Sequence, residues 1–313
     1  MAGDHKKPYI FLDEIQNIEG WEKYVRRLAD MKFRVNITGS NSKMLSHEIA
    51  STLGGRFMIV QIFPYSFDEY LHALGKEKDY LQVLSTSEKA EINKIYEQYV
   101  RYGAFPELVD IQNKRTYLNS IYQTIYIGDI LTRNNITNDF AVRLILKKLA
   151  ESVMKPISYS RLANIVSGAG LGIGKQTVIN YVGYMMDAYL LFSIQNYAAK
   201  LVDKETSPKY YFMDTGLCAY LCKWPSAEVL KGGVMRGAFF ETYVVSEILK
   251  SYSNRGIDYR YCVSYYRGKD KKEKGEAEID LIIEENGVLY PIEIKKNEAV
   301  KADQASAFPV LDH

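Results

Sequence analysis

The stretch PYIFLDEIQ at residues 8–16 sets the fold class of this 313-residue chain. Its apolar and aromatic residues 9–12 predict a short apolar strand, which two acids follow directly. A helical pattern at residues 21–31 and a second strand at 33–38 come next, an alternation typical of a parallel α/β sheet. Ligands bind such sheets at the carboxyl ends of the strands, so Asp13 and Glu14 are candidate site residues.

The second strand also ends in polar residues. It runs into Gly39-Ser40-Asn41-Ser42, which places small polar side chains at the same edge of the predicted sheet. At such an edge a first acid can hold Mg²⁺, a second can polarise water, and the small polar groups can sense a γ-phosphate. The alternative is that Asp13 and Glu14 only begin a loop or cap the following helix, since acids are common there.

Composition indicates a globular protein that can bury several cores. The chain is 47% hydrophobic and 25% charged, and its net charge is only +2, so overall charge neither supports nor excludes a nucleic-acid partner. Its three cysteines have no metal-ligand spacing and fit reduced thiols. No apolar run approaches the ~20 residues of a membrane span, and the first residues lack a signal-peptide core. We therefore expect a cytoplasmic protein with no membrane partner.

Patterns along the chain predict four unequal parts. Residues 1–75 are half of an α/β nucleotide-binding core, and residues 76–133 are a helical connector that is broken near Gly103-Ala104-Phe105-Pro106 and shows no obvious chemistry. Residues 134–205 read as helices followed by a strand at 190–194. Residues 206–313 mix strands with one long helix at about 236–252. The expected fold class is α/β multi-domain.

Three stretches of the first part carry a family resemblance. FLDEIQNIEGWEKYVRRL, NITGSNSKML and LGGRFMIVQIFPYSFDEYL resemble the second half of the prokaryotic AAA-type ATPases that carry a C-terminal domain of unknown function 4143, and the resemblance continues over nearly the whole chain. It implies that Asp13 and Glu14 are the Walker B pair. It also implies that Ser40 or Asn41 is the sensor and that Arg56 is a phosphate-sensing arginine.

The chain departs from that family in one respect. No Gly-rich Walker A loop with its lysine precedes the first strand, so the chain is expected to begin inside a nucleotide-binding domain. Tight binding of ATP, the cofactor of the parent family, is therefore not expected. The alternative is an active ATPase whose Walker A half comes from another chain.

Residues 158–194 predict a winged helix. A short capped helix, a glycine-rich turn, a second helix from Lys175 to Met186 and a strand follow one another. DNA-binding versions place the second helix in the major groove, but the exposed side of this one offers only Lys175, Gln176, Thr177 and Asn180. A structural or protein-contacting role is favoured, and DNA contact stays open.

The richest chemical pattern is EIDLIIEENGVLYPIEIK at residues 278–295. Asn286-Gly287 is the strongest short hairpin signal, and a turn there puts Asp280 opposite Glu293 and Glu278 opposite Lys295. Opposed β-carbons are about 5 Å apart, so the two carboxylates repel unless a cation or a proton lies between them. A metal ion is the natural solution. The alternative is a half-exposed hairpin whose outer face is simply charged.

This set resembles the PD-(D/E)XK nuclease fold. The resemblance implies that Asp280 and Glu293 hold Mg²⁺, that Lys295 helps to activate water, and that Glu241 is the acid on the first helix. We therefore expect a nucleic-acid-associated protein, with DNA as a partner, whose C-terminal domain is a metal-dependent nuclease or its descendant. The alternative is a binding module that clamps DNA or a protein without cutting, because a fold alone does not establish chemistry.

Overall fold

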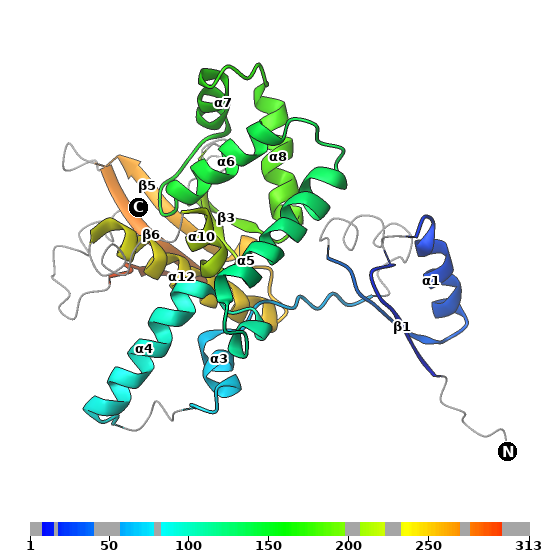
Figure 1. Ribbon diagram of the computed structural model, residues 1–313, viewed down its shortest axis with the longest axis horizontal. Coiled ribbons are helices and arrows are strands. Elements are labelled where there is room, and N and C mark those ends of the chain that lie inside the picture. The colour runs from blue at the N-terminus through cyan, green and yellow to red at the C-terminus, as the bar shows by residue number, and fades with distance from the viewer. Residues whose placement is uncertain are drawn as a thin grey trace.

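The chain has a mixed α/β architecture (Figure 1). The computed structural model describes residues 8–15, 18–40, 57–77, 83–197, 207–222, 233–269 and 276–295. A two-stranded sheet lies near the N-terminus and a five-stranded sheet in the second half, with helices between them. The predicted α/β class is thereby confirmed.

The N-terminal unit is a strand–helix–strand crossover, with β1 (Tyr9–Leu12), α1 (Trp21–Asp30) and β2 (Arg34–Ile37). The two strands pair in parallel, with Tyr9 beside Arg34 and Leu12 beside Ile37. Helix α1 buries Trp21 and Val25 against Ile15, which attaches the helix to the sheet. In Figure 1 this unit lies to one side of the main body.

Helices form the middle of the chain. Two of them begin with capping boxes, in which Ser66 and Ser85 accept hydrogen bonds from the main-chain N–H groups of Glu69 and Glu88. The predicted break near residue 103 is confirmed, because α4 ends at Gly103 with a positive φ of 79°. The elements are α3 (Phe67–Ala73), α4 (Thr86–Tyr102), η3 (Pro106–Val109), α5 (Lys114–Gln123), the π-helix η4 (Thr124–Thr132), α6 (Asp139–Glu151), α7 (Tyr159–Gly168) and α8 (Lys175–Asp187).

The second sheet has the strand order β4-β3-β5-β6-β7 and is antiparallel except between β3 and β5. Because β3 pairs with both β4 and β5, the predicted boundary at 205/206 falls between two strands of one sheet. The elements of this part are β3 (Leu191–Asn196), β4 (Lys209–Phe212), α10 (Thr215–Leu221), α12 (Gly233–Asn254), η5 (Tyr259–Tyr261), β5 (Val263–Lys269), β6 (Glu276–Glu285) and β7 (Val288–Ile292).

The predicted hairpin register is confirmed. Strands β6 and β7 pair with Leu281 opposite Ile292 and Ile283 opposite Tyr290. Asn286 and Gly287 form the turn with φ values of 53° and 76°, and positive values at both positions are what a two-residue I′ turn requires. The hairpin signal therefore fixed which side chains share a face.

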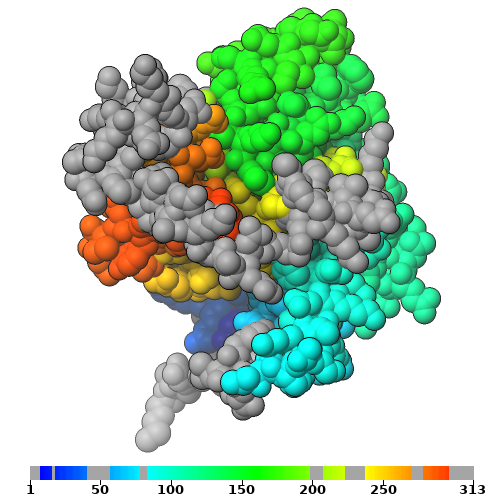
Figure 2. All heavy atoms as spheres, turned by 90° about the vertical axis from the view of Figure 1, so that its left-hand side faces the viewer, coloured from blue at the N-terminus to red at the C-terminus, as the bar shows by residue number. Residues whose placement is uncertain are grey.

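One large core joins the helices of the middle to the second sheet. Aromatic rings of α4 and α12 meet edge to face, as in the pair Tyr96 and Tyr243 with ring centroids 5.1 Å apart. The buried Lys250 of α12 donates hydrogen bonds to the Tyr65 carbonyl and the Tyr99 hydroxyl and pairs with Glu247. Figure 2 shows β5–β7 (orange to red) and α6–α8 (green) on one face, with α12 (yellow) between them.

Helix α10 begins against the end of α4. The buried Asp214 carboxylate accepts hydrogen bonds from the N–H of Leu217, at 3.0 Å, and from the N–H of Ala104, at 2.8 Å. Burial raises the pKa of Asp214. Gly216 lies so close to Tyr102 that a β-carbon on it would be 2.2 Å from that residue's carbonyl carbon. The two helix ends therefore meet backbone to backbone.

Among the helices in the described ranges, none combines the length and the hydropathy that crossing a lipid bilayer requires.

Candidate functional site

Asp13 and Glu14 lie at the carboxyl end of β1, as predicted. The Thr38 hydroxyl, at the end of β2, donates a hydrogen bond to the Asp13 carboxylate. The main-chain N–H of Glu14 donates to the same hydroxyl at 3.2 Å, and Glu14 has a positive φ of 46°. Thr38 thus ties the two strand ends together and orients the acids, a role that sequence reasoning did not assign to it.

Ser40 faces the helical connector. Its hydroxyl donates to the Asp129 carboxylate at 3.3 Å and accepts from the Arg133 guanidinium at 3.4 Å, while Arg133 pairs with Asp129 at 2.8 Å. Burial raises the pKa of Asp129, and Arg133 and Ser40 only partly offset this. The connector, in which the sequence showed no obvious chemistry, therefore supplies a charged pair to this edge. Asn41 and Arg56 lie outside the described residues.

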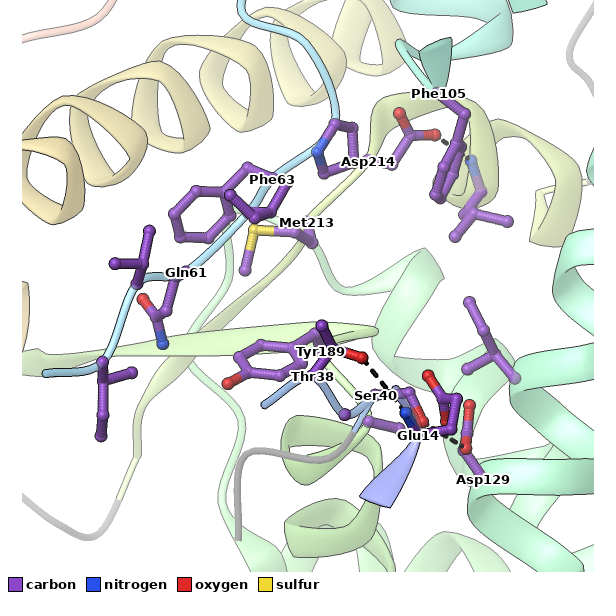
Figure 3. A pocket seen from close by; sticks show the side chains of 18 of the residues that line it. Glu14, Thr38, Ser40, Gln61, Phe63, Phe105, Asp129, Tyr189, Met213 and Asp214 are labelled. Carbon is purple, nitrogen blue, oxygen red and sulfur yellow. Dashed lines mark hydrogen bonds between the residues drawn. The ribbon is translucent and has the colours of Figure 1, made fainter. Parts of the chain in front are cut away.

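A cavity of about 450 Å³ opens at this contact (Figure 3). Glu14, Thr38, Ser40 and Asp129 gather at one end of it. Apolar side chains such as Phe63, Phe105, Met213 and Leu217 form much of the rest of the wall. The carboxyl ends of β1 and β2 thus line one end of this cavity, and residues from the rest of the chain line the remainder.

The second set of predicted residues gathers at the end of the β6–β7 hairpin. The register of the ladder, extended past Ile292, puts Asp280 opposite Glu293. Asp280 accepts a hydrogen bond from the Ile294 N–H at 2.9 Å, and the Lys295 ammonium lies 2.5 Å from Glu293 and 3.7 Å from Asp280. Burial alone would lower the pKa of Lys295, but the two carboxylates raise it. The hairpin therefore brings Asp280, Glu293 and Lys295 together.

Glu241 on α12 belongs to the same charged cluster. The Tyr211 hydroxyl donates to its carboxylate at 2.6 Å, and the Lys209 ammonium is 3.7 Å away. Burial raises the pKa of Glu241 to about 7, although Lys209 and Tyr211 lower it, and Asp280 contributes to the rise. Burial also raises the pKa of Tyr211 well above its usual value, with Glu241 adding to the effect.

Glu278 has a partner that the sequence did not predict. The register that puts Asp280 opposite Glu293 also puts Glu278 opposite Lys295, but the Glu278 carboxylate forms its ion pair with Lys209, at 3.0 Å. Lys209 is fully buried at the start of β4, and its ammonium lies 5.0 Å from the centre of the Tyr265 ring. Sequence reasoning missed Lys209 and Tyr211, whose only local signal is a lysine at the head of an aromatic strand.

The acids at the hairpin suit a hard divalent cation. Carboxylate oxygens are the ligands that Mg²⁺ prefers, and proteins commonly bind it through one or two carboxylates together with water and substrate phosphates. Within the described ranges, no three histidine, cysteine or acidic side chains are grouped closely enough to enclose a metal ion. Asp280 and Glu293 therefore offer two carboxylates, which is within the one or two that proteins commonly contribute to Mg²⁺.

The pKa of Glu241 makes the stability of the metal-free protein depend on pH. The folded state holds this proton up to about pH 7, against 4.5 in the unfolded chain, so the contribution is complete below pH 4.5 and is lost as the pH rises through 7. Relative to Glu241→Gln, the free energy of unfolding should fall by about 3 kcal/mol over this interval. Urea titrations in EDTA measure this difference, and parallel curves for the two proteins would exclude a raised pKa.

Three protein families match different parts of the chain. Residues 1–71 match the AAA domain, residues 93–228 match domain of unknown function 8612, and residues 236–312 match domain of unknown function 4143. The middle match begins inside α4 and continues beyond α10, so it covers the helices of the middle of the chain and the strand pair β3–β4.

Two curated relatives are themselves uncharacterised. A protein of Methanocaldococcus jannaschii is 36% identical over 194 residues, which cover 61% of this chain and 44% of the relative. A protein of Haemophilus influenzae is 31% identical over 221 residues, which cover 69% of this chain and 53% of the relative. The chain spans about half the length of these relatives. The matches at residues 1–71 and 236–312 support an AAA-type ATPase family with a C-terminal domain of unknown function 4143.

Proposed function

We propose that the C-terminal part of this ATPase-family protein is a metal-dependent nuclease that holds Mg²⁺ on Asp280 and Glu293. The observation that carries the proposal is that both acids lie beside Lys295. Its ammonium is 3.7 Å from the Asp280 carboxylate and 2.5 Å from the Glu293 carboxylate. An acid, a second acid and a lysine two residues later are the set that the PD-(D/E)XK resemblance implies. Glu241 adds the acid from the helix, and its pKa responds to Asp280.

Each side chain of the cluster has a distinct proposed task. When bound, the metal ion supplies a Lewis acid for attack on a phosphodiester. The Lys295 ammonium stabilises the negative charge that develops on the phosphate. Glu241, held by the Tyr211 hydroxyl and with a pKa of about 7, accepts or retains a proton near neutral pH.

The N-terminal edge has a separate proposed role in nucleotide chemistry. Asp13, oriented by Thr38, would hold the Mg²⁺ of ATP, and Glu14 would polarise water. Ser40 would contact the γ-phosphate of ATP. Its hydrogen bond to Asp129 would then couple the presence of that phosphate to helix η4. A Gly-rich phosphate-binding loop from outside the described residues is needed to complete this site.

Residues 139–212 support a winged-helix role in binding a partner. Helices α6, α7 and α8 are followed by the antiparallel pair β3 and β4, the order of elements in that fold. On α8, Gln176 donates a hydrogen bond to Asn180 at 3.2 Å, and Lys175 is the basic residue of this helix. The small positive charge favours a structural or protein-contacting role over a phosphate-binding one.

Cleavage of DNA tests the nuclease proposal. Supercoiled plasmid and branched DNA, incubated with the protein and Mg²⁺ or Mn²⁺, should be nicked or cut. Lys295→Ala should lower the rate by about 100-fold or more, the usual cost of losing one group that stabilises the transition state. Circular dichroism of the variant controls for folding.

A non-catalytic binding module is the competing function. Lys295 already neutralises part of the charge of Asp280 and Glu293, which is how such a pair is kept without a metal. If wild-type protein binds DNA but cuts nothing with either metal, the binding function replaces the nuclease proposal.

A further inference from the structure

Lys209 is a buried cation with an unusual environment. Its side chain has no exposed surface, and its ammonium lies 3.0 Å from a Glu278 oxygen and 3.7 Å from a Glu241 oxygen. Neither contact is a hydrogen bond, so within the described structure the nitrogen is held by charge and by the face of the Tyr265 ring. An ammonium buried in this way costs solvation energy that only nearby negative charge can offset.

The carboxylates around Lys209 adjoin the proposed metal site. Glu278 and Asp280 are two residues apart on β6 and so share one face of the strand. Four acids, Glu241, Glu278, Asp280 and Glu293, thus face two ammonium groups, which leaves a formal charge of −2 if every acid is ionised. One divalent ion at Asp280 and Glu293 neutralises that charge.

We propose that the Lys209 ammonium takes the place of a second divalent cation, so that this cluster binds one metal ion per chain. Glu241 and Glu278 flank the Lys209 ammonium at 3.7 Å and 3.0 Å, so without it two carboxylates, the ligands that a divalent cation prefers, would be left beside the proposed site. Lys209 occupies that position and holds both acids toward the site. The inference rests on the proposed metal site at Asp280 and Glu293.

Counting bound Mn²⁺ tests the inference. Isothermal titration at pH 8 is done in an Asp13→Asn background, so that the N-terminal edge does not contribute. The parent should bind one Mn²⁺, and Lys209→Ala, which empties the space between Glu241 and Glu278, should bind two. Two ions in the parent, or one in the variant, would overturn the inference. If Lys209→Ala does not fold, Lys209→Gln removes the same charge with a smaller loss of volume.

Lys250→Ala is the matched control. Lys250 is also a buried lysine, but its ammonium meets one carboxylate, Glu247, together with the oxygens of Tyr65 and Tyr99. This variant should still bind one Mn²⁺, and a second ion would show that losing any buried lysine creates binding. A parent that binds no Mn²⁺ removes the proposed metal site itself, whereas one ion in both parent and Lys209→Ala removes only the role of Lys209.

Discussion

Asp280→Asn should weaken Mn²⁺ binding by about 100-fold or more and abolish DNA cleavage. Loss of an outer partner of a metal ligand typically costs 10- to 100-fold in affinity or activity, so loss of a direct ligand should cost about as much or more. The asparagine oxygen can still accept the hydrogen bond from the Ile294 N–H, so the end of the hairpin should keep its shape. Titration calorimetry with Mn²⁺ and the plasmid assay measure the two losses.

Glu284→Gln is the matched control for that variant. Glu284 is an exposed acid of the same strand, and it lies opposite Leu289 and away from the charged cluster. The Glu284→Gln variant removes one negative charge from the same hairpin. Its Mn²⁺ affinity and cleavage rate should nevertheless stay within about twofold of the wild-type values, because exposed charges at a distance are screened. Equal losses in both variants would mean that only the overall charge of the hairpin matters.

Gly216→Ala should lower the free energy of unfolding by about 3 kcal/mol or more, at or beyond the upper end of the cost of overpacking. The new β-carbon would lie 2.2 Å from both the carbonyl carbon and the oxygen of Tyr102, and 2.5 Å from the Gly103 nitrogen. These are main-chain atoms at the end of α4, so no side-chain rotation can make room. Urea unfolding followed by circular dichroism measures the change.

Gly183→Ala provides the comparison within a helix. An added β-carbon on Gly183 in α8 would have no neighbour within 4 Å, so alanine should stabilise the protein by up to about 1 kcal/mol through its higher helix propensity. If Gly216→Ala unfolds at the wild-type urea concentration, helix α10 does not abut the end of α4 as described.

Local sequence signals predicted much of the fold and part of the candidate site. Asn286-Gly287 determined the turn, and the two-residue periodicity of the strands then placed Asp280 opposite Glu293 without further information. The acids at 13 and 14 followed an apolar run, and the parallel pairing of β1 with β2 put them at one sheet edge with Thr38. In both cases two strands that follow one another in the chain pair directly, and this pairing decides the geometry.

The remaining contacts depend on long-range packing. Lys209, Glu241 and Glu278 come from β4, α12 and β6, and no spacing rule relates them before the five-stranded sheet and its helix assemble. The contact of Ser40 with Asp129 joins residues 89 positions apart. Asp129 also belongs to a π-helix, a rare conformation that an apolar helical pattern does not distinguish from an α-helix.

Anomalous diffraction from a crystal grown with Mn²⁺ tests the metal site most directly. A peak between the carboxylates of Asp280 and Glu293, with the Lys295 ammonium displaced from between them, is the predicted result. A second peak beside Glu241 and Glu278 is not expected while Lys209 is present. Absence of a peak at Asp280 and Glu293 at saturating Mn²⁺, with Lys295 still bridging the two acids, would contradict the metal site and the nuclease function built on it.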